Sequence, residues 1–144
     1  MKNIIFFSST VKKPYGGVKI IYQFSNYINS LNGFRSSVVQ LEKKKIYKWT
    51  ESFKKKIGIK EKISTGWKFK ELKSNKNSKL SFDKKNDFII LPEIFAHFAE
   101  DFLINNKIPY AIFVQNGYNV FPTNDIRKIN LAYKKAKFIL SYSK

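Results

Sequence analysis

Residues 3–33, NIIFFSSTVKKPYGGVKIIYQFSNYINSLNG, contain the pattern that decides the fold of this chain. The run from Asn3 to Ser9 is β-branched and aromatic, which is typical of a strand buried on both faces in a parallel sheet. From Val18 to Asn32 a narrow polar stripe recurs at helical spacing, which predicts a helix packed deeply against that sheet. The pair Gly16-Gly17 lies between the two, so the chain opens with a strand, a glycine turn and a helix.

The same alternation continues along the chain after this opening. Further elements are predicted as a strand at Arg35–Leu41, a strand at Asp87–Leu91, a helix at Ile94–Asn106, a strand at Tyr110–Val114, a helix starting at Thr123-Asn124-Asp125, and a strand starting at Phe138. Strands that alternate with helices indicate βαβ units, so we predict an α/β fold: a single Rossmann-like, mainly parallel sheet of about five strands with helices on both faces. Ligands of such sheets bind at the carboxyl ends of the strands.

The basic residues are concentrated in one segment. The chain has 144 residues and a net charge of +18. Residues 43–85 hold 16 lysines against 4 acidic residues, a balance of +12, and the other 101 residues contribute only +6. We therefore expect one domain over residues 1–144, with a Lys/aromatic-rich insertion at about 43–85. An AT-rich genome also favours lysine, so the charge alone does not identify a polyanion partner.

Several classes of function are disfavoured by composition. The chain has no cysteine, a single histidine (His97) and no Asp-x-Asp motif, which argues against a metal site and against a bound cofactor. The N-terminal apolar run is too short for a signal peptide, and no run of about 18 apolar residues occurs. The expectation is a cytoplasmic protein.

Polar residues follow the predicted strands at the edge where ligands bind. Glu93 can bond a sugar hydroxyl or act as a base, or it can simply favour the first turn of a helix. Gln115 and Asn116 can bind sugar or phosphate, or form an ordinary turn with the glycine that follows. Gly16 and Gly17 can border an anion at a helix N-terminus, or make a tight turn with positive φ. The fingerprints for dinucleotides and for P-loops are absent.

His97 precedes Asp101 by four residues on a predicted helix. A carboxylate that holds an imidazole is a catalytic arrangement in principle, but no serine or cysteine nucleophile accompanies this pair. A surface helical pair is the simpler interpretation.

The insertion carries a second set of candidate residues. Residues 46–57 have the spacing of a basic amphipathic helix, with Trp49 on its apolar side and Lys54, Lys55 and Lys56 around it. Such a helix can lie on an anionic membrane, or dock on its own domain or on a partner. Trp67 among lysines can stack on nucleic-acid bases, but no nucleic-acid-binding motif accompanies it, so nucleic acid is disfavoured as a partner.

Taken in order, four segments resemble the N-terminal domain of GT-B fold glycosyltransferases (glycosyltransferase family 4-like). They are FFSSTVKKPYGGVKIIYQFSNYINSLNG, DFIILPEIFAHFAEDF, IPYAIFVQNGYNVF and AKFILSYS. The resemblance covers nearly the whole chain apart from residues 43–85. It implies that Gly16 and Gly17 border the donor phosphates, and that Glu93, Gln115 and Asn116 line the acceptor side of the cleft. Many members have a histidine where this chain has Gln115-Asn116, so no catalytic residue is assigned.

The resemblance also implies the partners. The substrates are a nucleotide-sugar and a glycan or lipid-linked acceptor, with no metal or other cofactor. A GT-B enzyme has a second, C-terminal donor domain that this chain lacks. We therefore expect a truncated or split gene product of polysaccharide or cell-envelope glycan synthesis that is inactive alone, cytoplasmic and peripheral on the inner face of the membrane.

Two other functions stay open. The chain can be a non-enzymatic module that binds polyanions, nucleic acid or a membrane surface through the insertion. It can also be a catalytically dead interaction partner completed by another chain.

Overall fold

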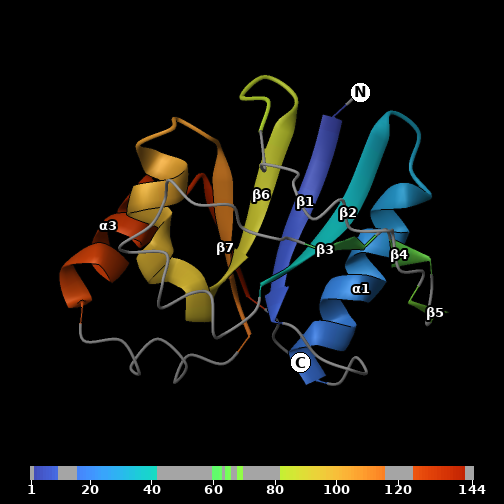
Figure 1. The fold of residues 1–144 in the computed structure, drawn as a ribbon, viewed down its shortest axis with the longest axis horizontal. Coiled ribbons are helices and arrows are strands. Elements are labelled where there is room, and N and C mark those ends of the chain that lie inside the picture. The colour runs from blue at the N-terminus through green and yellow to red at the C-terminus, as the bar shows by residue number, and fades with distance from the viewer. Residues whose placement is uncertain are drawn as a thin grey trace. The chain divides into compact units, whose positions relative to one another are not determined.

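The computed structural model describes residues 2–9, 16–41, 60–62, 64–65, 68–69, 82–115 and 125–141 (Figure 1). The chain divides into two compact units, Met1–Ser81 and Phe82–Lys144.

The first unit has a strand–helix–strand opening at the predicted place. Its elements are β1 (Lys2–Ser9), α1 (Gly16–Asn29), β2 (Phe34–Leu41), β3 (Lys60–Lys62), β4 (Ser64–Thr65) and β5 (Lys68–Phe69). β1 and β2 pair in parallel, in a register that runs from Lys2 opposite Phe34 to Ser9 opposite Leu41. The pairing is parallel because α1 carries the chain back to the starting edge between the two strands (Figure 1).

The predicted insertion adds strands of its own. β3 pairs with β2 in antiparallel fashion, with Lys60 opposite Gln40 and Lys62 opposite Val38, and β4 pairs with β5 in the same sense. The sheet of this unit is therefore parallel at β1–β2 and antiparallel at β2–β3. A strand that pairs with the outer edge of β2 protects backbone groups that would otherwise be open to other chains.

The interior of the first unit combines apolar packing with neutral polar pairs. Phe7, Ile21, Val38 and Val39 are each at most 1% exposed. Gln40 donates a hydrogen bond from Nε2 to the hydroxyl oxygen of Tyr22 at 2.8 Å, and both residues are buried.

The end of α1 differs from the prediction. The helix was expected to extend to Asn32, but it stops at Asn29. The Asn29 side chain accepts a bond from the Ser36 N–H (2.6 Å) and donates one to the Ser36 carbonyl (2.9 Å). The Asn29 side chain thereby satisfies the backbone N–H and carbonyl of Ser36, a β2 residue outside the pairing with β3. Gly33, with φ +85°, then completes the turn into β2.

The described part of the second unit has three strands with helical connections. Its elements are β6 (Asp87–Pro92), η1 (Glu93–Phe98), η2 (Glu100–Ile104), β7 (Tyr110–Val114), α3 (Ile126–Lys135) and β8 (Phe138–Ser141). β7 pairs in parallel with β6 on one side and with β8 on the other, so that Ala111 lies opposite both Ile90 and Phe138. The helical segments η1, η2 and α3 lie together on one side of these strands (Figure 1).

The helix predicted at Ile94–Asn106 is present, but it has no α-helical pitch. The segment is a 3₁₀-helix over η1 followed by a π-helix over η2, and Asn105 N–H donates to the Glu100 carbonyl five residues earlier. The 3₁₀ turns are tighter than those of an α-helix, and the π turn is wider. The apolar spacing therefore located the segment without fixing its pitch.

The other helix of this unit starts as predicted. Asp125 caps α3, because its carboxylate accepts a hydrogen bond from the Lys128 N–H at 3.0 Å. Ala132 on α3 is fully buried, and the Tyr110 hydroxyl donates to its carbonyl at 2.6 Å. This bond joins α3 to β7.

The predicted fold class is confirmed. The protein is α/β and Rossmann-like, and the β1–β2, β6–β7 and β7–β8 pairings are all parallel. The five strands at which the sequence predicted a parallel sheet are all present.

Candidate functional site

Two predicted site residues meet at the carboxyl ends of β6 and β7. Glu93 directly follows β6, and Gln115 directly follows β7. The parallel register places Pro92 opposite Phe113, so both strands end at the same edge. The Glu93 carboxylate accepts a hydrogen bond through Oε2 from the Gln115 backbone N–H at 2.8 Å. We call this the Glu93–Gln115 pair.

The two members of the pair differ in exposure. Glu93 is 2% exposed, whereas Gln115 is half-buried. The Glu93 carboxylate is enclosed and bonded to the chain's own backbone, so it holds the conformation directly after β7. Gln115 is the more exposed member of the pair. The expectation that Glu93 itself lines an acceptor cleft stays a prediction.

The charge of Glu93 also acts on a side chain of α3. Tyr133 is half-buried, and its pKa is raised first by burial and then by the negative charge of Glu93. Tyr133 follows Ala132, whose carbonyl accepts a hydrogen bond from the Tyr110 hydroxyl at the start of β7, so this end of α3 lies toward the amino ends of the strands.

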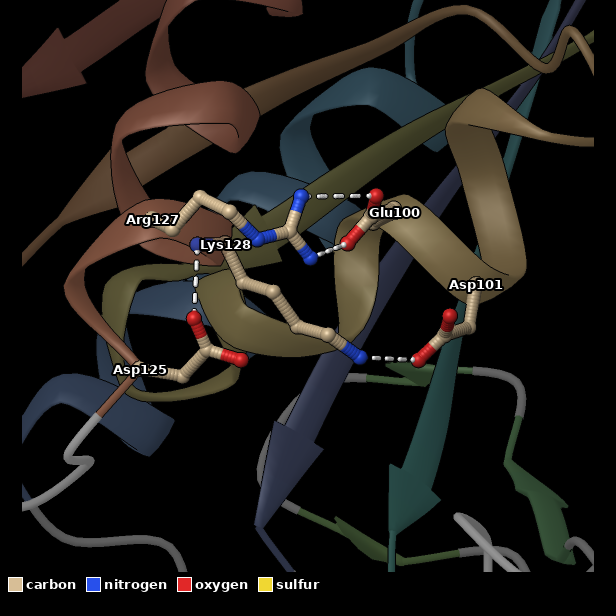
Figure 2. Close-up of polar contacts among 5 residues, drawn as sticks. All are labelled: Glu100, Asp101, Asp125, Arg127 and Lys128. Atoms are coloured by element: carbon tan, nitrogen blue, oxygen red, sulfur yellow. Dashed lines mark hydrogen bonds and ion pairs between the residues drawn. The ribbon is translucent and has the colours of Figure 1, made fainter.

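Ion pairs hold α3 against η2 (Figure 2). Arg127 bonds both oxygens of Glu100, at 3.1 and 2.7 Å, and Lys128 bonds Asp101 at 2.8 Å. These carboxylate bonds raise the pKa of both basic side chains. The two ion pairs join the first turn of α3 to η2.

The predicted pairing of His97 with Asp101 is replaced by the bond between Asp101 and Lys128. His97 is half-buried, and its ring centroid lies 3.8 Å from that of Phe98. Burial lowers the pKa of His97, the charge of Lys128 lowers it further, and Asp125 opposes the change. These surroundings therefore favour the neutral form of the His97 imidazole.

The glycine turn belongs to the first unit. Gly16 opens α1 with φ +47°, and a Cβ added there would meet no atom within 4 Å. The backbone conformation therefore requires glycine at this position, whereas the space around it does not. This observation supports the tight-turn interpretation for Gly16. The donor-phosphate role of Gly16 and Gly17 stays a prediction.

The other predicted site residues, Asn116, Trp49, Lys54, Lys55, Lys56 and Trp67, lie outside the described residues. Within the described ranges, no group of three or more His, Cys, Asp or Glu side chains is arranged to hold a metal ion. No helix in the part of the chain that the structure describes is both long and apolar enough to cross a membrane.

Comparison of the chain with protein-family models, with curated proteins and with solved structures finds no match. The sequence and the geometry above therefore carry the functional argument.

Proposed function

We propose that this chain is the acceptor-binding N-terminal domain of a nucleotide-sugar-dependent glycosyltransferase of polysaccharide or cell-envelope glycan synthesis. The observation that carries the proposal is the Glu93–Gln115 pair at the carboxyl ends of two parallel strands. This is the edge at which α/β sheets bind their ligands.

The chemistry of the pair suits a sugar. The Gln115 amide has donors and an acceptor, and sugar hydroxyls need both. Glu93 holds the backbone of Gln115 in one conformation, so less ordering is required when a glycan binds.

The donor is assigned to the other predicted element. The N-terminus of α1 begins at Gly16 and Gly17, and a helix N-terminus favours an anion such as the diphosphate of a nucleotide-sugar. The proposal includes no metal and no other cofactor. The proposal assigns most contacts with the nucleotide-sugar to a second, C-terminal donor domain.

The proposal is tested by binding of the purified chain to an array of bacterial-type polysaccharide fragments. Replacing Gln115 by Ala should reduce glycan binding about tenfold, since two or more bonds to sugar hydroxyls are lost. Gln23→Ala is the matched control, because Gln23 is an exposed glutamine on α1. Binding unchanged in Gln115→Ala, or binding to no glycan at all, would contradict the proposal.

A second function is favoured by the charge of residues 43–85, which is +12. A polyanion-binding module would use this insertion on a membrane surface or on nucleic acid. Replacing Lys54, Lys55 and Lys56 by Glu should then abolish sedimentation with anionic vesicles, and affinity for single-stranded DNA should fall steeply with salt. Equal binding to neutral and anionic vesicles would exclude this function.

A further inference from the structure

β8 has the apolar sequence of an interior strand, but its side chains are exposed to solvent like those of an edge strand. Phe138, Ile139 and Leu140 are 63%, 56% and 42% exposed, whereas Ala111, Ile112 and Phe113 on the neighbouring β7 are at most 4% exposed. β8 pairs with β7 along one edge, and no described strand pairs with its other edge.

The exposed side chains of β8 lie on both of its faces. Successive residues of a strand point to opposite sides, so Phe138 and Leu140 share one face and Ile139 lies on the other. The ring of Phe138 is 6.1 Å from that of Phe88 on β6, which places that face over the sheet. A strand that is apolar on both faces is typical of the middle of a parallel sheet. The free edge also presents backbone groups that can pair with another strand.

Positive charge surrounds the start of this strand. Lys134, Lys135 and Lys137 are all exposed, and none of them forms an ion pair with another described residue. Lys134 and Lys135 end α3, and Lys137 directly precedes Phe138 at the amino end of β8. A segment that pairs with β8 therefore meets an apolar strip that ends in three cations.

We propose that β8 binds an extended segment of a partner protein that is apolar and carries acidic residues at the end next to Lys137. The segment pairs with the free edge as an added strand, so main-chain hydrogen bonds supply affinity, and the apolar faces and lysines supply selectivity. A second copy of this chain fits less well, since it would bring its own lysines and a net charge of +18. This inference does not depend on the proposed glycosyltransferase function.

The test is a fluorescence anisotropy titration of the full chain with two labelled peptides. Both contain alternating valine and threonine, and one ends in a run of glutamates where the other ends in lysines. The glutamate peptide should bind about tenfold more tightly at low salt, and this advantage should shrink as salt screens the charges. Hydrogen exchange should slow at the amides of β8 when the glutamate peptide is added.

Two variants locate the binding. Ile139→Lys should abolish binding, whereas Ile126→Lys, the control at a residue 69% exposed in the same unit, should not change it. Replacing Lys134, Lys135 and Lys137 by Glu should reverse the preference between the peptides without touching the apolar core. Equal affinity for both peptides would overturn the proposal. So would a dimer in analytical ultracentrifugation that the same Lys→Glu variant leaves intact and Ile139→Lys dissociates.

Discussion

The two units bury different kinds of polar group. In the first, the buried pairs are neutral: the Ser25 and Ser36 hydroxyl oxygens lie 2.8 Å apart, and Gln40 bonds Tyr22. In the second, β6 has a buried carboxylate next to each end. Asp87 accepts a bond from the Asp83 N–H at 2.7 Å, and Glu93 accepts one from the Gln115 N–H.

The neutral pairs and the buried carboxylates differ in what their burial costs and in what it achieves. A buried neutral pair exchanges bonds to water for bonds within the protein at little net cost. A buried carboxylate costs considerably more free energy to desolvate. That cost is offset where the hydrogen bond of the carboxylate fixes a backbone conformation. Glu93 fixes the chain directly after β7, at the edge where parallel sheets bind ligands. Of the two buried carboxylates, Glu93 therefore belongs to the candidate site, whereas the neutral pairs of the first unit belong to its packing.

The largest effect is expected at alkaline pH, where both units should lose folding stability together. Burial raises the pKa of Tyr22 and of Tyr110 from 10.0 to about 12, although the Gln40 bond opposes part of the change at Tyr22. A raised pKa means that the folded state favours the neutral hydroxyl. The stability from these hydroxyls is complete below pH 10 and is lost as pH rises through 12.

Urea unfolding followed by circular dichroism at pH 9, 10, 11 and 12 measures this loss. The midpoint should fall by more than any substitution below lowers it, because two buried groups titrate at once. Tyr22→Phe and Tyr110→Phe should each make the fall shallower. A midpoint that stays constant from pH 10 to 12 would show that neither hydroxyl is buried as described.

Removing the Glu93 carboxylate should have the largest effect of any single substitution. Glu93→Ala leaves the Gln115 N–H without this acceptor and opens space in the interior, which should lower the free energy of unfolding by about 2–3 kcal/mol. Glu93→Gln keeps an acceptor oxygen and should cost less. Chemical denaturation measures both, and equal, small losses for the two variants would mean that the carboxylate holds nothing in place.

Much of this fold could be predicted from apolar periodicity, because burial dictates it. The strand at Tyr110–Val114 and the cap at Asp125 are where the residue pattern placed them. The pitch of η1 and η2 could not be predicted, since it depends on the packing of the whole segment. The pairing of β3 with β2 was also missed, because it joins residues about twenty positions apart and has no local signal.

The candidate site was predicted in part. Strand order along the sequence was enough to place Glu93 and Gln115 at one edge. It did not show that the Glu93 carboxylate turns inward to a backbone N–H, because burial of a side chain next to a strand end depends on its neighbours in three dimensions. The effect of the Glu93 charge on Tyr133 was missed for the same reason.

Replacing Gln40 measures how much a neutral buried pair of the first unit contributes to stability, for comparison with Glu93 in the second unit. Gln40→Ala removes the bond to Tyr22 and leaves that buried hydroxyl without its donor, so a loss of about 1–2 kcal/mol is expected. The loss should be smaller than that of Glu93→Ala when both are measured by urea denaturation. The reverse order would contradict the contrast between the two units.

The glycine turn of the first unit tests how much backbone conformation contributes to stability. Gly16→Ala forces a side chain into φ +47° and should cost about 1 kcal/mol. Gly17 has no positive φ, so Gly17→Ala is the matched control and should be nearly neutral in thermal unfolding. Similar losses for both would mean that the turn needs both glycines for some reason other than φ.

The smallest effect is expected from the surface charges of α3. Lys128 bonds Asp101 at 2.8 Å, but the two side chains are 23% and 41% exposed. Water and salt therefore screen the pair, and a double-mutant cycle with Lys128→Ala and Asp101→Ala should give a coupling of about 0.5 kcal/mol at low salt. In 1 M salt the coupling should vanish.

The same cycle separates charge on the surface from charge in the interior. The bond of Glu93 to Gln115 is enclosed, so the loss in Glu93→Ala should change little over the same range of salt. If instead the Lys128–Asp101 coupling persisted in 1 M salt, these ion pairs would be part of the interior of the second unit. The buried charged residues of this unit would then include Lys128 and Asp101 as well as Glu93.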